Sequence, residues 1–196
     1  SEPGCAGPQI KPICGASLLG IIELSRGCGR GCTFCTMADK AMYHLDPNLI
    51  CSDLETNAAA GITSVVSGSE DLFRWGSDGI HPDFEQLTSL LEKMHEVKGL
   101  SFMQIDHANI TSILQLKISQ LKQIRRLLSW NKPTDYLWVN MGAESANGQL
   151  VERHSRGKIS PYRPEDWQDM VLESSDRLLH SGFFPVYSII LGLPGE

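Results

Sequence analysis

The sequence lacks the features that mark membrane and secreted proteins. No apolar run approaches the roughly eighteen residues of a transmembrane helix, and no hydrophobic signal segment stands at the N-terminus. Six cysteines in 196 residues are too sparse for a disulfide framework. A net charge of -6 argues against a strongly basic nucleic-acid surface, although it leaves a local basic patch and a nucleic-acid partner open. We therefore expect a cytoplasmic protein with no membrane contact.

The composition is that of an ordinary globular protein, with 41% hydrophobic and 20% charged residues. Residues 1–18 contain several prolines and glycines without a periodic pattern, which predicts a linker or N-terminal extension. Residues 19–196 are long enough for one sizeable core, so a single domain is expected there. Cys5 and Cys14 in the linker are interpreted as incidental thiols, and Cys51 as a small buried hydrophobe.

Three other cysteines carry the strongest chemical signal. Cys28, Cys32 and Cys35 are spaced C-x3-C-x2-C on one short loop, and glycines between them let the backbone wrap closely. Three thiolates suit a four-iron cluster with one iron left free to bind a small molecule. A structural zinc site would need a fourth ligand, and the nearest candidate, His44, lies in an unpatterned stretch. A non-enzymatic iron-sulfur electron carrier would instead cover all four irons.

With Phe34 as its aromatic residue, this loop resembles the radical S-adenosylmethionine (SAM) family. The resemblance implies a [4Fe-4S] cluster whose open iron binds SAM, reductive cleavage of SAM to a 5'-deoxyadenosyl radical, and a reductant such as flavodoxin or ferredoxin. The longer stretch around the cysteines is similar to the subgroup that carries a cobalamin-binding domain. A cobalamin would then be bound by a domain outside this chain.

The resemblance also implies which residues hold SAM. Gly68, Ser69 and Glu70 follow the second predicted strand, where relatives bind the SAM amino group, and Asp71 is the alternative acceptor. An acidic turn after a strand is otherwise usually a helix cap. The remaining implied positions are distributed over later strand ends: Phe34 near adenine, Glu144 and Ser145 on the ribose, Arg156 with its basic neighbours Arg153 and Lys158 near the SAM carboxylate, and Ile190 and Gly192 on the adenine. No catalytic residue is assigned.

The pattern of elements predicts an α/β protein. We expect strands at 19–24, 62–67, 100–106, 136–141 and 183–191, and helices at 46–61, 84–97, 112–128 and 164–180. Alternating strands and helices indicate parallel βαβ units, but the pattern alone does not separate a barrel from an open doubly wound sheet. The resemblance implies a partial (β/α)6 TIM-like barrel with five βα units visible and a C-terminal truncation. The last strand should then be an edge with Tyr187, Ile189 and Ile190 exposed.

The reaction is left open at this stage. Methyl transfer with cobalamin, methylthiolation of RNA or protein, and carbon-skeleton rearrangement all fit the same core, because a fold and a cofactor do not fix a substrate. Asp106, at the end of the third predicted strand, is interpreted as a turn cap rather than as a site residue.

Overall fold

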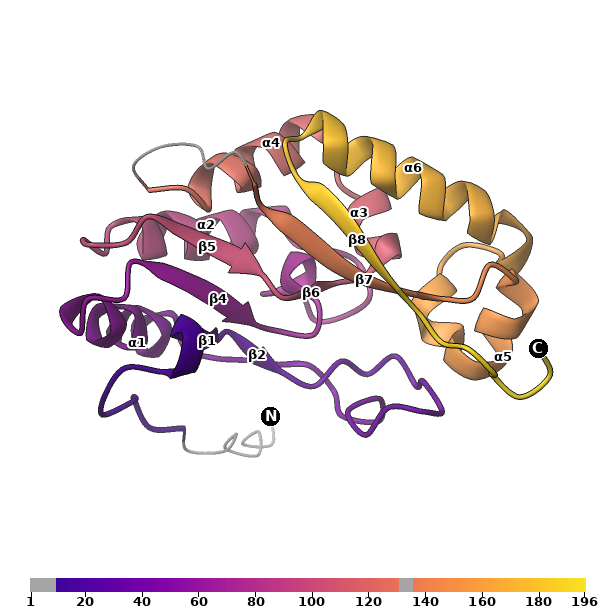
Figure 1. The fold of residues 1–196 in the computed structure, drawn as a ribbon, viewed down its shortest axis with the longest axis horizontal. Coiled ribbons are helices and arrows are strands. Elements are labelled where there is room, and N and C mark those ends of the chain that lie inside the picture. Colours follow the sequence, from indigo (N-terminus) through magenta and orange to yellow (C-terminus); the bar gives the residue numbers. More distant parts are fainter. Residues whose placement is uncertain (1–9, 131–135) are drawn as a thin grey trace, which may run out of the picture.

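A computed structural model describes residues 10–130 and 136–196 of the chain. Five main parallel strands form its centre: β1 (Ile21–Glu23), β4 (Ser64–Gly68), β5 (Phe102–Ile105), β7 (Trp138–Glu144) and β8 (Phe184–Ile189). Each lies within or beside a predicted strand. Figure 1 shows them as one curved array in the order in which they occur in the chain. The arrangement is an open portion of a parallel β/α barrel, as expected.

The array is divided at Asp106 into two hydrogen-bonded sheets. β5 pairs with β4 on one side, and the short strand β6 (His107–Ala108), one residue further along the chain, pairs with β7 on the other. The Gln104 side chain of β5 connects the two sheets, because its amide donates hydrogen bonds to the carbonyls of Ile105 and of Trp138 on β7. One continuous stretch of chain therefore joins the two sheets and lets the array curve.

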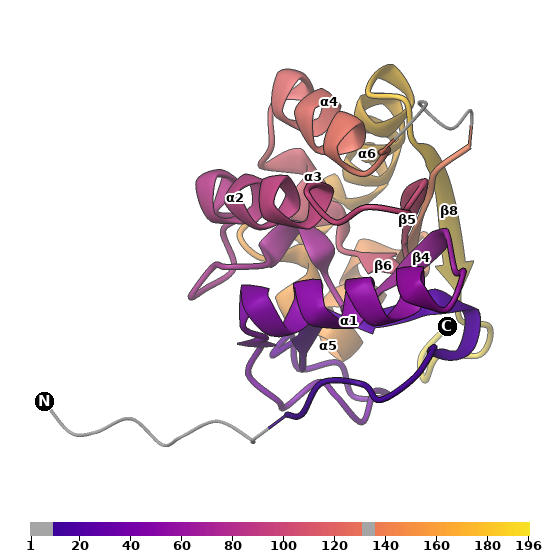
Figure 2. The same cartoon turned by 90° about the vertical axis from the view of Figure 1, so that its left-hand side faces the viewer.

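Helices cover one side of this array, as Figure 2 shows. They are α1 (Pro47–Ala59), α2 (Phe84–His95), α3 (Ile110–Leu114), α4 (Ile118–Leu127), α5 (Gly148–Ile159) and α6 (Trp167–His180), with short 3-10 turns η1 (Leu18–Gly20), η2 (Leu72–Arg74) and η3 (Pro164–Asp166). α1 begins as predicted: Asp46 caps it by accepting a hydrogen bond from Asn48 N at 2.7 Å, and Pro47 occupies its first turn. None of the described helices is both long and apolar enough to cross a bilayer.

The single helix predicted over 112–128 is wrong, because the chain breaks between α3 and α4. Arg177 of α6 donates hydrogen bonds to the carbonyls of Leu114 and Leu116 at 3.0 and 2.9 Å, so the carbonyl groups released at the break are satisfied by a side chain from outside. Gln120 then accepts from Lys117 N at 2.8 Å at the start of α4. The spacing of apolar residues is helical across the whole segment, so it gave no sign of this break.

Three further elements, two strands and one helix, were not predicted. β2 (Ser25–Arg26) and β3 (Tyr43–His44) form an antiparallel ladder that closes the cysteine loop at its base. α5 occupies the basic segment around Arg156, where no helix was predicted, and Asn147 caps it by accepting from the backbone N–H groups of Gln149 and Leu150.

The last strand has a free edge. Within the described residues β8 pairs with β7 alone. Ile189 is 63% exposed, as expected for such an edge, whereas Tyr187 and Ile190 are less exposed than predicted, because each is half-buried. Tyr187 is less exposed than predicted because its ring packs against the core and its hydroxyl contacts Ser174, Ser175 and the Val171 carbonyl of α6.

The segment predicted as a linker is partly outside the described residues, as is Cys5. Residues 10–17 form no helix or strand, but they are attached to α1. Asp53 accepts a hydrogen bond from Ile13 N at 2.9 Å, and Asn57 accepts from Ser17 N at 3.0 Å. Cys14 is exposed, and Cys51 is half-buried rather than fully buried.

Candidate functional site

The cysteine loop follows β2 and is shaped by its own backbone. Cys28 N donates to Lys40 O at 2.9 Å and Gly31 N donates to Ala38 O at 3.1 Å, so the loop folds back on itself. Gly27, Gly29 and Gly31 all have φ between 68° and 85°, a region that disfavours side chains with Cβ atoms. The turn of the loop therefore requires glycine at all three of these positions.

The three loop cysteines are free thiols in different environments. Cys32 is buried, Cys28 is half-buried and Cys35 is exposed. Burial raises the pKa of the Cys28 thiol, with nearby Asp71 adding to the rise and Arg30 and Arg74 opposing it. Across residues 10–130 and 136–196, no group of three or more Cys, His, Asp or Glu side chains is gathered tightly enough for a single metal ion. A four-iron cluster binds each thiolate through a separate iron, so it does not require such a tight group.

A buried ionic network holds this loop in place. Asp71, fully buried after β4, accepts hydrogen bonds from Arg30 Nη2 at 3.0 Å and Arg74 Nε at 3.1 Å. Arg74 in turn donates to the carbonyl of Cys28 at 2.6 Å. Arg30 is 3% exposed, so its guanidinium supports the loop from inside the protein and also places positive charge near the Cys28 thiol.

Helix α5 is the second support of the loop. Ser155 departs from helical geometry with φ -152°, and the carbonyl of His154 beside it accepts a hydrogen bond from Thr33 N at 2.8 Å. The carbonyl of Gly157 accepts from Arg30 Nη1 at 2.6 Å. A Cβ at Gly157 would clash with the backbone of Arg30, so glycine permits the close approach. The carbonyl groups on both sides of the kink in α5 therefore accept hydrogen bonds from the cysteine loop.

Glu70 and Asp71 are adjacent but have separate environments. Both carboxylate oxygens of Asp71 are engaged: Oδ1 accepts from Asn109 N, and Oδ2 accepts from Ser112 as well as from the two arginines. Glu70 Oε2 is buried without a hydrogen-bond partner. Burial raises the pKa of the Glu70 carboxyl, while the backbone N–H groups of Glu70 and Gly27 lower it. Of the two acidic residues, Glu70 is the one with an oxygen left for a ligand.

Ser69 has a role that the sequence did not reveal. Its hydroxyl lies 2.6 Å from the hydroxyl of Ser25, and both side chains are buried. Gly68 packs against the backbone of Ile22 and Glu23, and its carbonyl accepts from Leu24 N at 2.9 Å. The second strand end is thus attached directly to the strand that enters the cysteine loop.

Glu144 marks a strained strand end. It adopts φ 61°, rare for a residue with a side chain, at a register shift in the pairing of β7 with β8. Its carboxylate is buried and paired with Lys158, which also donates to the carbonyl of Gly142 at 3.1 Å. Ser145 faces an apolar cavity of about 380 Å³ beside Trp167, Tyr187 and Ile189. Arg156 is exposed on α5, so Lys158 and not Arg156 is the basic residue that the structure brings to Glu144.

The last predicted site residues lie near α5 as well. Ile190 N donates to Glu144 O at 2.9 Å, which continues the β8 ladder into Gly192 with φ 79°. The carbonyl of Pro194 accepts from His154 Nε2 at 2.9 Å. Phe34 is 44% exposed beside the cysteines. The C-terminal segment and the cysteine loop therefore both contact His154.

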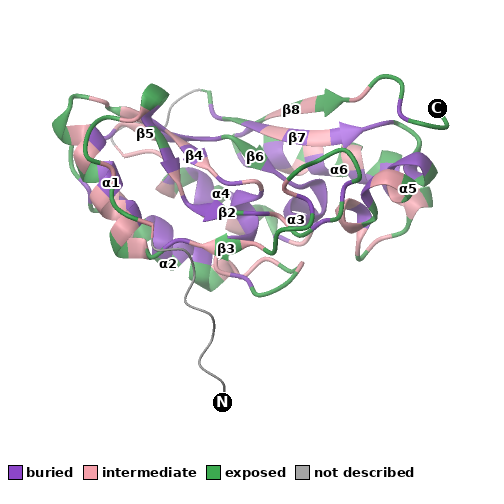
Figure 3. Ribbon diagram, turned by 90° about the horizontal axis from the view of Figure 1, so that it is seen from below, coloured by how far each residue is buried: buried purple, intermediate pink, exposed green. Residues whose placement is uncertain are grey.

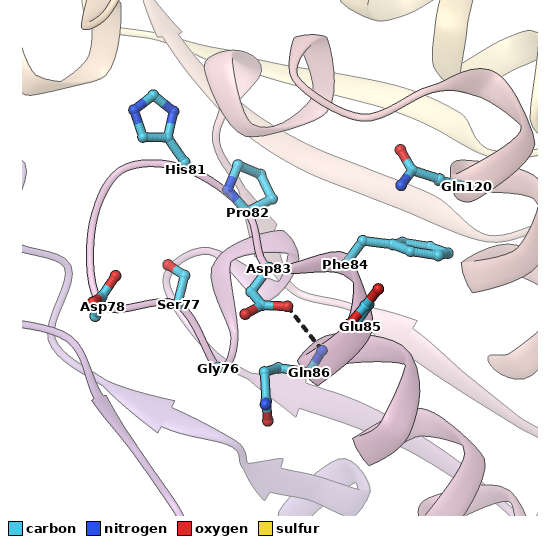
Figure 4. Close-up of a pocket in the computed structure, with 10 residues that line it drawn as sticks. All are labelled: Gly76, Ser77, Asp78, His81, Pro82, Asp83, Phe84, Glu85, Gln86 and Gln120. Carbon is cyan, nitrogen blue, oxygen red and sulfur yellow. Dashed lines mark hydrogen bonds between the residues drawn. The ribbon is translucent and has the colours of Figure 1, made fainter.

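A separate polar pocket lies among the loops at the start of α2. It has a volume of about 550 Å³ and an acidic lining that includes Asp78, Asp83 and Glu85, as Figure 4 shows. Asp83 is occupied as the helix cap, since its carboxylate accepts from Gln86 N at 3.0 Å. None of the predicted site residues lines this pocket.

Comparison with known proteins decides the family. The family model described as "Radical SAM superfamily" matches residues 22–196. The chain belongs to the radical SAM superfamily. Its members are enzymes, and their cofactors are a [4Fe-4S] cluster and SAM. No curated protein matches this radical SAM chain in sequence.

Solved structures support the fold of this radical SAM chain. The cobalamin-dependent SAM radical enzyme OxsB, with aqua-cobalamin bound, is 18% identical over 87% of this chain at a TM-score of 0.60. The radical SAM methyltransferase TsrM from Kitasatospora setae, with cobalamin and a [4Fe-4S] cluster, is 14% identical over 91% at 0.65. HydG, a maturase of the [FeFe]-hydrogenase, is 12% identical over 88% at 0.55. The chain spans only 23%, 32% and 35% of those three structures' own lengths.

The residues present fit the cofactors of the family. Three free thiols on a glycine-shaped loop supply the donor set of a cluster. The unpartnered oxygen of Glu70 is a hydrogen-bond acceptor for an ammonium group close to Gly27 of that loop. Sequence reasoning missed Arg30, Arg74, His154 and Gly157 as supports of the loop, since their partners are distant in sequence.

Proposed function

We propose that residues 19–196 form the core of a radical SAM enzyme that cleaves SAM reductively. Cys28, Cys32 and Cys35 hold the [4Fe-4S] cluster, and Glu70 accepts hydrogen bonds from the amino group of SAM. When bound, the cluster supplies one electron that splits SAM into methionine and a 5'-deoxyadenosyl radical. The observation that carries the proposal is the buried, unpartnered Glu70 Oε2 next to the cysteine loop.

The other positions complete the SAM site. Glu144 and Ser145 hydrogen-bond the ribose, Gly68 and Ser69 present their backbone to the amino end, and Phe34, Ile190 and Gly192 contact the adenine. Arg156 is exposed on α5, the helix that contacts the cysteine loop through His154 and Gly157, and its flexible guanidinium can bind the SAM carboxylate. Two hydrogen bonds of His154 support this grouping, because they connect two of the strand ends: its carbonyl accepts from Thr33 N, and its ring donates to the carbonyl of Pro194.

We further propose a cobalamin-dependent methyl transfer or rearrangement as the reaction class. The structures of OxsB and TsrM both contain cobalamin, and the likeness covers only part of each. A cobalamin-binding domain would lie elsewhere in the polypeptide, and the reductant would be a small electron carrier such as flavodoxin or ferredoxin. The protein would act in the cytoplasm.

The proposal is tested by cluster assembly and SAM cleavage. The anaerobically reconstituted chain should release 5'-deoxyadenosine when dithionite and SAM are added. Cys32→Ala should lose the cluster, because two cysteines cannot hold it, whereas a Cys5→Ser, Cys14→Ser and Cys51→Ser triple variant should keep it. Iron analysis and electron paramagnetic resonance measure both. A cluster with four cysteine ligands that does not respond to SAM would refute the proposal, and loss of iron in the triple variant would refute the ligand assignment.

A further inference from the structure

The face of the sheet opposite the helices carries a row of polar side chains. Figure 2 shows that no described helix covers this face, which we call the open face. Side chains alternate along β7, where Val139 and Met141 are buried and Trp138 and Asn140 point the other way. Figure 3 shows β7 and β8 side by side at one edge of the molecule, with exposed positions along β8. Polar residues of the open face are therefore available to a ligand.

Four of these residues form a continuous hydrogen-bonded chain across three strands. Asp106 Oδ2 lies 2.9 Å from His107 Nδ1, His107 Nε2 lies 3.2 Å from Asn140 Nδ2, and Ser188 Oγ donates to Asn140 Oδ1 at 3.3 Å. The strand register explains the alignment, because His107 pairs with Asn140 across β6 and β7. Asp106 was interpreted from sequence as a turn cap, but its carboxylate instead holds the imidazole of His107.

The directions of these hydrogen bonds are mutually consistent and define one form of the imidazole. A carboxylate only accepts, so His107 donates from Nδ1 to Asp106. Nε2 is then the basic nitrogen and accepts from the amide of Asn140, whose oxygen accepts from Ser188. Asp106 and His107 side chains are 50% and 49% exposed, so the basic nitrogen is held in place without being enclosed. An imidazole oriented by a carboxylate is the arrangement of a general base.

The row belongs to the same end of the sheet as the SAM site. His107 lies close enough to Glu70 that a positive charge on its imidazole would lower the pKa of that carboxyl, against the effect of burial. Asp106 and Glu70 make this region acidic, whereas the charge of the half-exposed Glu23 is balanced by its ion pair with Arg26 at 2.5 Å. The acidic surroundings favour a neutral or cationic ligand group over a carboxylate or a phosphate.

We propose that His107 is a proton acceptor for the substrate, positioned by Asp106, and that the row from Asp106 to Ser188 binds a hydroxyl or ammonium group of that substrate. The substrate group first displaces the Asn140 amide from Nε2. Its O–H or N–H bond then breaks, the electron pair stays on the oxygen or nitrogen, and the proton forms a bond to His107 Nε2. Asp106 stabilises the resulting imidazolium. This inference rests on the proposed function, because the substrate must reach the open face beside SAM.

The position of the imidazole proton tests the row directly. In 15N spectra of histidine-labelled protein at neutral pH, His107 should carry its proton on Nδ1. His44 is an internal reference of the opposite form, since its Nε2 faces the carbonyl of Ser77 at 2.8 Å and its Nδ1 accepts from Gly76 N. Asp106→Ala should move the His107 proton to Nε2, Asp106→Glu should restore it to Nδ1, and His44 should not change. A wild-type His107 protonated on Nε2 alone would overturn the proposal.

Acylation by diethyl pyrocarbonate tests whether Nε2 is available. This reagent attacks an accessible, unprotonated ring nitrogen, so peptide mapping should find His107 modified. Asn140→Ala should accelerate the reaction, because it removes the amide that covers Nε2. Modification of His180, whose side chain is 63% exposed, without modification of His107 would overturn the proposal.

Release of 5'-deoxyadenosine by the wild-type chain separates the two proposals. If none is released, the proposed function fails, while the nitrogen spectra and the acylation pattern still decide the role of the row. If it is released and His107 shows the wrong proton position, only the present inference fails.

Discussion

Replacing Asp71 with asparagine tests the buried network that supports the cysteine loop. The Asp71 side chain is fully buried and its partners Arg30 and Arg74 are nearly so, with side-chain exposures of 1% and 5%. Asparagine keeps the size of the side chain but removes the charge that balances two guanidinium groups. Removing one partner of a buried ion pair typically costs about 3–5 kcal/mol, because it leaves uncompensated charge in the interior.

That cost is a large part of the total stability. Domains are stable by about 5–15 kcal/mol, and for a chain of this size each kcal/mol lowers Tm by roughly 2–4 °C. We therefore expect Asp71→Asn to lower Tm by about 6–20 °C in thermal unfolding followed by circular dichroism, on the same scale. Cluster content after reconstitution should fall as well, since Arg30 attaches the loop to Gly157 of α5 and Arg74 contacts the loop at the carbonyl of Cys28.

A matched control separates this effect from the general loss of a carboxylate. Glu173→Gln removes the partner of Arg177 on α6, in a pair whose glutamate side chain is 55% exposed. Exposed pairs contribute at most about 1 kcal/mol, so this variant should unfold close to the wild type and keep its cluster. An Asp71→Asn protein that is as stable as Glu173→Gln would refute the reasoning that Asp71 is the centre of the network.

Three further predictions concern single positions. Glu70→Gln should stabilise the cofactor-free protein at neutral pH but weaken SAM binding, because burial raises the pKa of the Glu70 carboxyl. The difference in stability between variant and wild type should be absent at low pH, appear as pH rises above the ordinary glutamate pKa of about 4.3, and be complete above the raised pKa. Urea unfolding at a series of pH values measures this difference. Gly157→Ala should cost about 1–3 kcal/mol by overpacking and lower cluster content, whereas Gly79→Ala, in open space, should do neither in the same unfolding and iron assays. Ile189→Lys should reduce self-association of the chain in light scattering, because it places a charge on the free edge of β8. Unchanged self-association would show that the chain does not associate through this edge.

The five main strands could be predicted from sequence because their signals are local. Short runs of branched residues bounded by glycine or proline predicted β1, β4, β5, β7 and β8, and Asp46 with Pro47 predicted the start of α1. The break between α3 and α4 could not be predicted, because it depends on Arg177, about sixty residues further along the chain. Periodicity reports which face of a helix is apolar and is insensitive to a side chain that arrives from another element.

The candidate site was predictable to a similar extent. The sequence indicated where the site lies, through the spacing of Cys28, Cys32 and Cys35 and through the expected order of the strand ends. The assignment of these residues to the cofactors stays a prediction. The buried ion pair of Arg30 could not be predicted, because charged residues are mostly exposed and its partner lies 41 residues further along the chain. That partner, Asp71, is itself recognisable only from the fold.

The division of labour between Glu70 and Asp71 follows from their positions at the end of β4. The strand ends at Gly68 and the chain bends at Glu70, so the two adjacent carboxylates enter different surroundings. Asp71 meets two arginines and has no acceptor capacity left for a ligand. Glu70 keeps an unpartnered oxygen at a site that disfavours its charge, a condition that a bound ammonium group would relieve. The stability lost at Glu70 and the rigidity gained at Asp71 are thus two consequences of one strand end, where a scaffold residue and a proposed binding residue of the same chemical type stand side by side.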